Sequence, residues 1–109
     1  MSIDEQTVDD IRVVLLGGEI DHDTAGAVRE SILRTAGAGA QRVVADLSSV
    51  TFLDSSGINV FLAAGQLISD GGGWLRIAGA QTPVRRVIEM IGLNLVIDCH
   101  PSVDQALAG

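Results

Sequence analysis

Two hydroxyl side chains and a carboxylate stand together in a short segment that reads Asp54, Ser55, Ser56 and Gly57. An apolar stretch precedes this segment and a strongly apolar one follows it, which predicts a helix that begins near Ser55 or Ser56. A helix N-terminus has unpaired N–H donors and a partial positive charge, so it tolerates a phosphate group. A phosphate would add about −1.5 to −2 charges to a neutral surface and would expel a docked partner. Ser55 is therefore the candidate phosphoacceptor, with Ser56 as the second choice.

The same residues allow two other interpretations. Ser and Asp side chains can cap a helix by accepting hydrogen bonds from its first N–H groups, a contribution of about 1 kcal/mol. A nucleophilic serine of the hydrolase type would need a glycine two positions earlier. Leu53 and Asp54 occupy those positions for Ser55 and Ser56. Only His22 and His100 could serve as the base, and His22 lies in a loop that could be near. The pattern therefore argues against serine hydrolysis.

A second polar cluster runs from Glu19 through Asp21, His22 and Asp23 to Thr24. Three carboxylates and an imidazole so close together could indicate a metal site. We favour the end of a strand followed by a helix cap, with Asp21 or Asp23 as the cap, because acidic residues complement the helix dipole. No metal ligand is assigned from the sequence.

Hydrophobic periodicity predicts the elements that position these two segments. The second strand is dense in β-branched residues, and the third is a continuous apolar run of the buried kind. Strands are expected at 3–8, 11–16, 42–47, 74–78 and 95–97. Helices are expected from about Ala25 to Gly37 or Gly39 (with Val28, Ile32 and Ala36 on the apolar face), from Ser55 to Ser69, from a Thr82 cap to Gly92, and over 103–108.

The order of these elements, β-β-α-β-α-β-α-β-α, predicts an α/β fold. Strands that alternate with helices form a mixed, mostly parallel sheet with right-handed crossovers. We expect a single domain over residues 1–109, with a sheet of about five strands flanked by about four helices. Aromatic residues make up only 3% of the chain against 47% hydrophobic residues, so the core must be aliphatic.

Charge and cysteine content narrow the class of partner. The net charge is −7 and no lysine occurs, which argues against nucleic acid and against an anionic membrane and favours a basic protein surface. Cys99 is the only cysteine, so no internal disulfide can form and an intracellular protein is expected. The segment 1–6 lacks the pattern of a signal peptide, and no apolar run approaches about 18 residues. We therefore expect a cytoplasmic protein.

Four segments together resemble the STAS domain and, within it, the bacterial anti-sigma factor antagonists. The resemblance covers about 3–107, and the segment around Asp-Ser-Ser-Gly is its most specific part. The four segments are Gly18-Glu-Ile-Asp-His-Asp-Thr-Ala25, Val44-Ala-Asp-Leu47, Val50-Thr-Phe-Leu-Asp-Ser-Ser-Gly57 and Ile91-Gly-Leu93.

The resemblance implies a regulatory switch rather than an enzyme. Unphosphorylated members bind an anti-sigma factor that is also a serine kinase of the histidine-kinase-like ATPase fold, and this frees a sigma factor. The kinase phosphorylates the serine that matches Ser55, the antagonist lets go, and a PP2C-type phosphatase resets it. Asp21 matches the family's loop aspartate near the kinase interface. The implied partner-binding residues are Asp21, His22, Asp23, Thr24, Asp54, Ser55, Ser56, Gly57, Ile58 and Asn59.

The nucleotide would belong to the kinase, because this chain has no nucleotide motif of its own and no cofactor is expected. A monomer or weak dimer is expected. Two alternatives stay open. One is a STAS module in a lipid-transport or other signalling complex that works without phosphorylation. The other is an enzyme or small-molecule binder with Asp21, His22 and Ser55 around a pocket.

Overall fold

The computed structural model describes residues 1–34 and 41–109 as one mixed sheet with helices on both sides. In chain order its elements are β1 (Ser2–Val8), β2 (Ile11–Ile20), α1 (Ala25–Leu33), β3 (Arg42–Leu53), α2 (Ser55–Asp70), β4 (Trp74–Ala78), α3 (Thr82–Ile91), the 3₁₀ turn η1 (Leu93–Leu95), β5 (Cys99–His100) and α4 (Val103–Ala108). The predicted α/β class and element order are confirmed.

The strands lie in the order β1-β2-β3-β4-β5. β1 is antiparallel to β2, and the three remaining pairs are parallel. Asp9 and Asp10 form the tight turn between β1 and β2, and both have positive φ angles, of 50° and 67°. Such a turn matches the twist of a hairpin, and Asp is among the residues that tolerate it. The sheet is therefore mixed and mostly parallel, as predicted.

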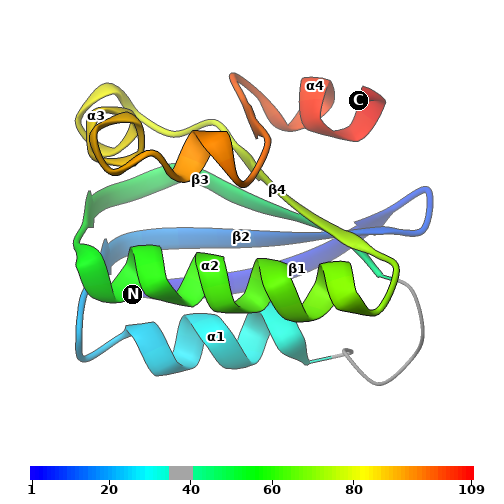
Figure 1. Cartoon of the computed structure of the whole chain (residues 1–109), viewed down its shortest axis with the longest axis horizontal. Coiled ribbons are helices and arrows are strands. Elements are labelled where there is room, and N and C mark those ends of the chain that lie inside the picture. Colours follow the sequence, from blue (N-terminus) through cyan, green and yellow to red (C-terminus); the bar gives the residue numbers. More distant parts are fainter. Residues whose placement is uncertain (35–40) are drawn as a thin grey trace.

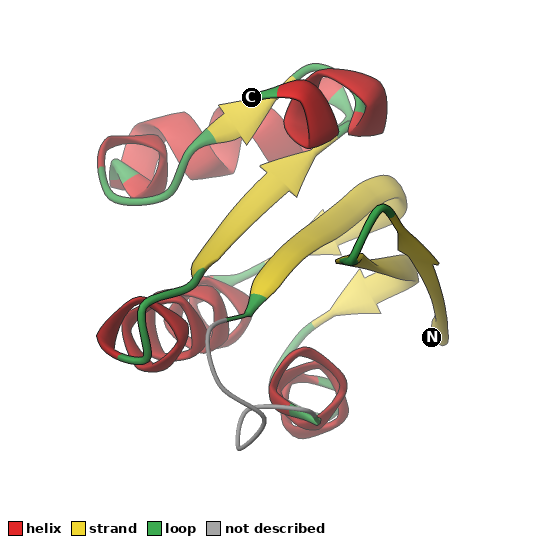
Figure 2. Cartoon of the chain, turned by 90° about the vertical axis from the view of Figure 1, so that its right-hand side faces the viewer, coloured by secondary structure: helices red, strands yellow, loops and turns green. Residues whose placement is uncertain are grey.

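The helices form two groups on opposite sides of the sheet (Figures 1 and 2). α1 and α2 lie side by side on one face, while α3 and α4 lie on the other side. The larger core is aliphatic apart from Phe61, which is fully buried in α2. Ala106 of α4 packs on the opposite face against Val13, Val44 and Ala78. No helix among the described residues has both the length and the apolar character needed to cross a bilayer.

Two strands are longer than predicted. β2 continues past Leu16 to Ile20, and β3 continues past Leu47 to Leu53, where the sequence suggested a loop. The extensions pair with each other, through Gly17 with Ser49 and onward to Ile20 with Leu53, across two irregularities in register. Local composition hid the extension because its stability comes from pairing between strands.

The C-terminal region differs from the prediction in three places. The expected strand at 95–97 is wrong, because η1 occupies Leu93–Leu95 and the short β5 follows at Cys99–His100. Thr82 is the first residue of α3 rather than its cap, since Gln81 takes the cap position and donates from Nε2 to the Ser48 carbonyl at 2.8 Å. Gly92 does end α3, in a left-handed conformation. The predicted end of α1 at Gly37 or Gly39, with Ala36, lies outside the described residues.

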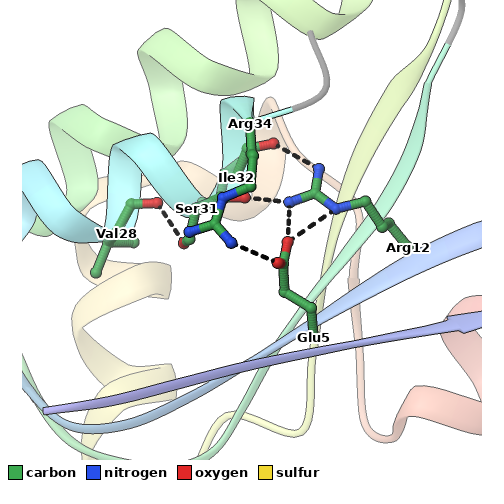
Figure 3. A network of polar contacts seen from close by, with 6 residues as sticks. All are labelled: Glu5, Arg12, Val28, Ser31, Ile32 and Arg34. Carbon is green, nitrogen blue, oxygen red and sulfur yellow. Dashed lines mark hydrogen bonds and ion pairs between the residues drawn. The ribbon is translucent and has the colours of Figure 1, made fainter. Parts of the chain in front are cut away.

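A polar network fastens the β1–β2 hairpin to the end of α1 (Figure 3). The Arg12 guanidinium donates to the carbonyl oxygens of Ser31 and Ile32, the latter at 3.1 Å. Its Nε also donates to Glu5 Oε1 at 3.0 Å, and Arg34 donates to Glu5 Oε2 at 2.9 Å. Because the last carbonyls of a helix have no partner within the helix, Arg12 supplies a donor that α1 lacks.

Candidate functional site

The two polar segments singled out from the sequence meet at the carboxyl ends of β2 and β3. These strands are parallel neighbours, and Ile20 pairs with Leu53 at their ends. The main-chain N–H of Asp54 donates to the Ile20 carbonyl at 3.3 Å, so the loop after β2 and the start of α2 adjoin. Both lie at the left-hand end of the sheet in Figure 1. Parallel pairing thus joins positions that lie 33 residues apart in the sequence, counted from Asp21 to Asp54.

Asp54 is the N-cap of α2. Its backbone is extended, and its Oδ1 accepts hydrogen bonds from the N–H groups of Ser56 at 2.9 Å and Gly57 at 3.4 Å. This satisfies two of the donors that a helix start leaves unpaired. The capping role that the sequence left open among Asp54, Ser55 and Ser56 therefore belongs to the aspartate.

Ser55 is the first residue of α2 and is exposed, while Ser56 is half-buried. Within the described part of the chain, neither hydroxyl takes part in a hydrogen bond to the protein, because Asp54 already caps the helix. No carboxylate or imidazole among those residues holds the Ser55 hydroxyl, as a nucleophilic serine would require. Ser55 therefore presents an unengaged hydroxyl to the surroundings at a helix N-terminus.

The Asp21 loop is held by its own hydrogen bonds. Asp21 Oδ1 accepts from the N–H groups of Asp23 at 2.9 Å and Thr24 at 3.2 Å. The Thr24 hydroxyl donates to the Glu19 carbonyl at 2.9 Å and accepts from the Asp21 N–H at 2.9 Å. The prediction of Asp21 or Asp23 as the cap is wrong, because Thr24 takes the N-cap position of α1 without a side-chain cap hydrogen bond, and Asp21 instead binds the amides that precede the helix. His22 and Asp23 are exposed.

Gly57 sets how closely α2 approaches the strands. A Cβ at this position would lie 2.3 Å from Leu53 Cδ1 and 2.7 Å from Ile20 Cγ2, both far inside contact distance. Ile58 is only 2% exposed and belongs to the core. Both were expected among the partner-binding residues, and their burial gives them the task of positioning Ser55 and the exposed Asn59.

Phe52 was not singled out from the sequence as a surface residue, yet it is 46% exposed at the end of β3. It pairs with Glu19 on β2, immediately beside both polar segments. Successive side chains in a strand point to opposite faces, and Leu53 is buried, so Phe52 must face the other way. Correct assignment of the strand beyond Leu47 would have revealed it.

The acidic cluster at Glu19–Asp23 does not converge in space. Within residues 1–34 and 41–109, no group of three or more His, Cys, Asp or Glu side chains is placed to hold a metal ion. The Asp21 Oδ1 is engaged with the main-chain N–H groups of Asp23 and Thr24.

Comparisons with known proteins agree with this fold and site. Residues 2–106 match the STAS domain family. An anti-sigma F factor antagonist from Paenibacillus polymyxa is 33% identical over 101 residues, which cover 89% of this chain and 84% of the relative. The crystal structure of an anti-sigma factor antagonist from Mycobacterium paratuberculosis superposes with a TM-score of 0.88 at 30% identity, over 98% of this chain and 91% of that one.

The fold is also that of SpoIIAA, an anti-sigma factor antagonist solved in unphosphorylated form. That structure has a TM-score of 0.80 at 22% identity and covers 97% of this chain and 93% of its own. A phosphorylated form from Bacillus has a TM-score of 0.73 at 21% identity, over 98% of this chain and 97% of that one. SpoIIAA structures thus share this fold in the unphosphorylated and the phosphorylated form. The chain belongs to the STAS domain family.

Proposed function

We propose that this chain is an anti-sigma factor antagonist controlled by phosphorylation of Ser55. The unphosphorylated chain binds an anti-sigma factor that is also a serine kinase of the histidine-kinase-like ATPase fold, and a sigma factor is freed. The kinase phosphorylates Ser55, the complex separates, and a PP2C-type phosphatase restores the chain. The family and the names of its relatives support the general role. We expect the switch to operate in the cytoplasm.

The observation that carries the proposal is the free hydroxyl of Ser55. It is exposed at the first position of α2, and Asp54 already accepts the hydrogen bonds from the first N–H groups of the helix. A kinase can therefore reach Ser55 without disturbing the cap. The N-terminal end of the helix dipole favours the negative charge of the product, so the fold survives phosphorylation.

Release of the partner follows from charge and shape at the surface. The proposed contact area comprises the exposed residues His22, Asp23 and Asn59 near Ser55, and it extends to Phe52 on the other face of the end of β3. A doubly charged group in the middle of this area would place unpaired charge in a buried interface, which costs several kcal/mol. The change is local, because nothing in the core depends on the Ser55 hydroxyl.

Phosphosite mapping by mass spectrometry, on protein purified from its native cells across growth and stress, tests the modification. We expect phosphate on Ser55 in a fraction of the protein that changes with conditions. Ser56→Ala is the matched control, because it removes the neighbouring hydroxyl and should leave the modification in place. A Ser55 that stays unmodified under all conditions would favour the alternative of a STAS module that works without phosphorylation.

Calorimetry with the kinase that the unmodified chain binds tests the consequence. Ser55→Ala should bind as the wild type does, whereas Ser55→Glu and the phosphoprotein should bind at least about tenfold more weakly, a loss of about 1.4 kcal/mol. Phe52→Ala should also weaken binding, since exposed aromatic residues often anchor interfaces. A phosphoprotein that binds as tightly as the unmodified chain would refute the switch.

A further inference from the structure

A second surface of the molecule lies at the opposite end of α2 and has no part in the proposed switch. It is a groove of about 490 Å³ between the C-terminal half of α2, the outer edge of β4 and the segment that leads into β5. Gln66 and Ser69 line it from α2, Leu75 from β4, and Val96 and Asp98 from the segment before β5. Ser55 and Gln66 are about 16 Å apart along the helix, from a rise of 1.5 Å per residue.

The floor of this groove is the first part of β4, whose edge on the β5 side is unpaired. The N–H of Trp74 donates to the Gln41 carbonyl at 2.8 Å on the β3 side, whereas the N–H of Ile77 donates to the Asp98 carbonyl at 2.9 Å on the β5 side. Because main-chain groups alternate in direction along a strand, the N–H and C=O of Leu75 point to the β5 side. β5 pairs only with Ile77 and Ala78, so within the described part of the chain no strand lies beside Leu75 on its β5 side, while its β3 side pairs with Val43.

An unpaired strand edge is a template for another extended chain. The open stretch of three residues, 74–76, is about 10 Å long, from a rise of 3.3 Å per residue. The groove beside it has apolar surface from the half-buried Leu62 and the exposed Val96, which can receive side chains of an added strand, and Leu75 and Ile97 are buried beneath it. Its outer wall continues into Leu95 and Val96, which are 85% and 71% exposed.

The charges around the groove select the kind of chain that fits. Asp98 lines one wall and is exposed, and Asp70 lies at the end of α2, where it accepts from Gln66 Nε2 at 2.8 Å. Arg76 also lines the groove, but its guanidinium is engaged, because it donates to the Ala106 carbonyl at 2.8 Å and stacks on Trp74. The chain as a whole carries −7. Basic side chains are therefore attracted, and a second copy of this acidic chain is repelled.

We propose that this groove binds an extended segment of another protein, apolar and basic in alternation, which adds as a strand beside Leu75 of β4. The main-chain hydrogen bonds supply affinity that does not depend on the sequence of the bound segment. The apolar wall and Asp98 supply selectivity. The site is independent of the switch, so a partner can occupy it whether or not Ser55 is phosphorylated.

Nuclear magnetic resonance on the full chain tests the proposal with a short peptide that alternates valine with arginine. The same peptide with glutamate in place of arginine is the control. We expect the basic peptide to shift the amide signals of Leu75, Gln66 and Asp98 and to slow hydrogen exchange of the Leu75 N–H by about tenfold or more. The Ile77 amide, already bonded to Asp98, is the internal reference and should change little.

Two variants of exposed α2 residues locate the binding. Ser69→Trp should fill the groove and abolish the effect, whereas Ala63→Trp, on the same helix outside the groove, should leave it intact. Asp98→Lys should weaken basic-peptide binding about tenfold or more. Unchanged Leu75 exchange, equal binding of the acidic peptide, or binding that persists in Ser69→Trp would overturn the proposal. A dimer in sedimentation that Ser69→Trp dissociates would assign the groove to a second copy instead.

Discussion

Neighbouring residues at the start of α2 have different tasks. Asp54 holds the first N–H groups of the helix, and Ser55 holds nothing within the described chain. Function and stability are therefore separated at adjacent positions, which lets a modified Ser55 change the surface and leave the helix unchanged.

Substitution of each residue should reveal this separation. Asp54→Ala should lower the free energy of unfolding by about 1 kcal/mol, because it leaves the amides of Ser56 and Gly57 unpaired. Ser55→Ala should change it by less than about 0.5 kcal/mol. Urea denaturation measures both values. A larger loss in Ser55→Ala than in Asp54→Ala would show that the serine is the cap.

Gly57 makes a second prediction at the scale of one residue. Gly57→Ala should destabilise the fold by about 1 to 3 kcal/mol, because its methyl group would collide with Leu53 and Ile20. Gly26→Ala is the matched control, since residue 26 is also in the first turn of a helix and has no heavy atom within 4 Å of the added Cβ. Thermal unfolding compares them, and the control should be neutral or slightly stabilising. Equal effects would remove close packing as the reason for the glycine.

At the scale of elements, the Arg12 network connects a β-hairpin to a helix. It bridges the β1–β2 hairpin and the last turn of α1 (Figure 3). The Arg12 side chain is 15% exposed and that of Glu5 is 27% exposed, so solvent screens this network only in part. The network sets where α1 ends against the sheet, far along the helix from the Asp21 loop.

Loss of this network should loosen α1 from its C-terminal end. Arg12→Ala should lower the free energy of unfolding by about 1 to 3 kcal/mol, as for hydrogen bonds to a charged group. It should also speed amide exchange in the last turn of α1. The exposed Arg29→Ala, within the same helix, should cost less than about 0.5 kcal/mol. Equal losses of the free energy of unfolding in the two variants, measured by urea denaturation, would count against a stabilising role of the Arg12 network.

At the scale of the whole molecule, the titration of a single side chain can be observed separately at high pH. The chain has no lysine and no tyrosine, so between pH 9 and 11 Cys99 is the one side chain that titrates near its ordinary range. The Cys99 thiol is exposed, and its pKa is raised from 9.0 to about 11 by desolvation from the surrounding chain and by the carboxylates of Asp98 and Glu89. Between these values the folded chain keeps a proton that the unfolded chain has lost.

Stability should therefore fall as pH rises from 9 towards 11, because the unfolded state binds fewer protons there. Cys99→Ser should remove the decrease in the free energy of unfolding that the thiol causes between pH 9 and 11. Below pH 9 the thiol should contribute no pH dependence in either protein. Urea denaturation across this range, on both proteins, measures the difference. Identical curves would mean that the thiol is not shielded in the folded chain. Slow alkylation of the wild type at neutral pH is the accompanying expectation.

Much of this protein is determined by local sequence. Apolar periodicity, the glycine at position 92 and the polar start of α2 determined the order of elements and placed Ser55 at a helix N-terminus, because helix starts and stops depend on residues a few positions apart. The aliphatic composition likewise determined the nature of the core.

Tertiary structure decided what depends on residues far apart in the chain. Pairing between β2 and β3 extended both strands and brought Asp21 beside Asp54. The extended backbone of Asp54 made this residue, and not Ser55 or Ser56, the cap of α2. Packing buried Ile58 and exposed Phe52, and the shortness of β5 left the β5 side of Leu75 without a strand among the described residues, although Leu75 pairs with Val43 of β3 on its other side. Such outcomes arise from non-local pairing and packing, which no window of sequence contains.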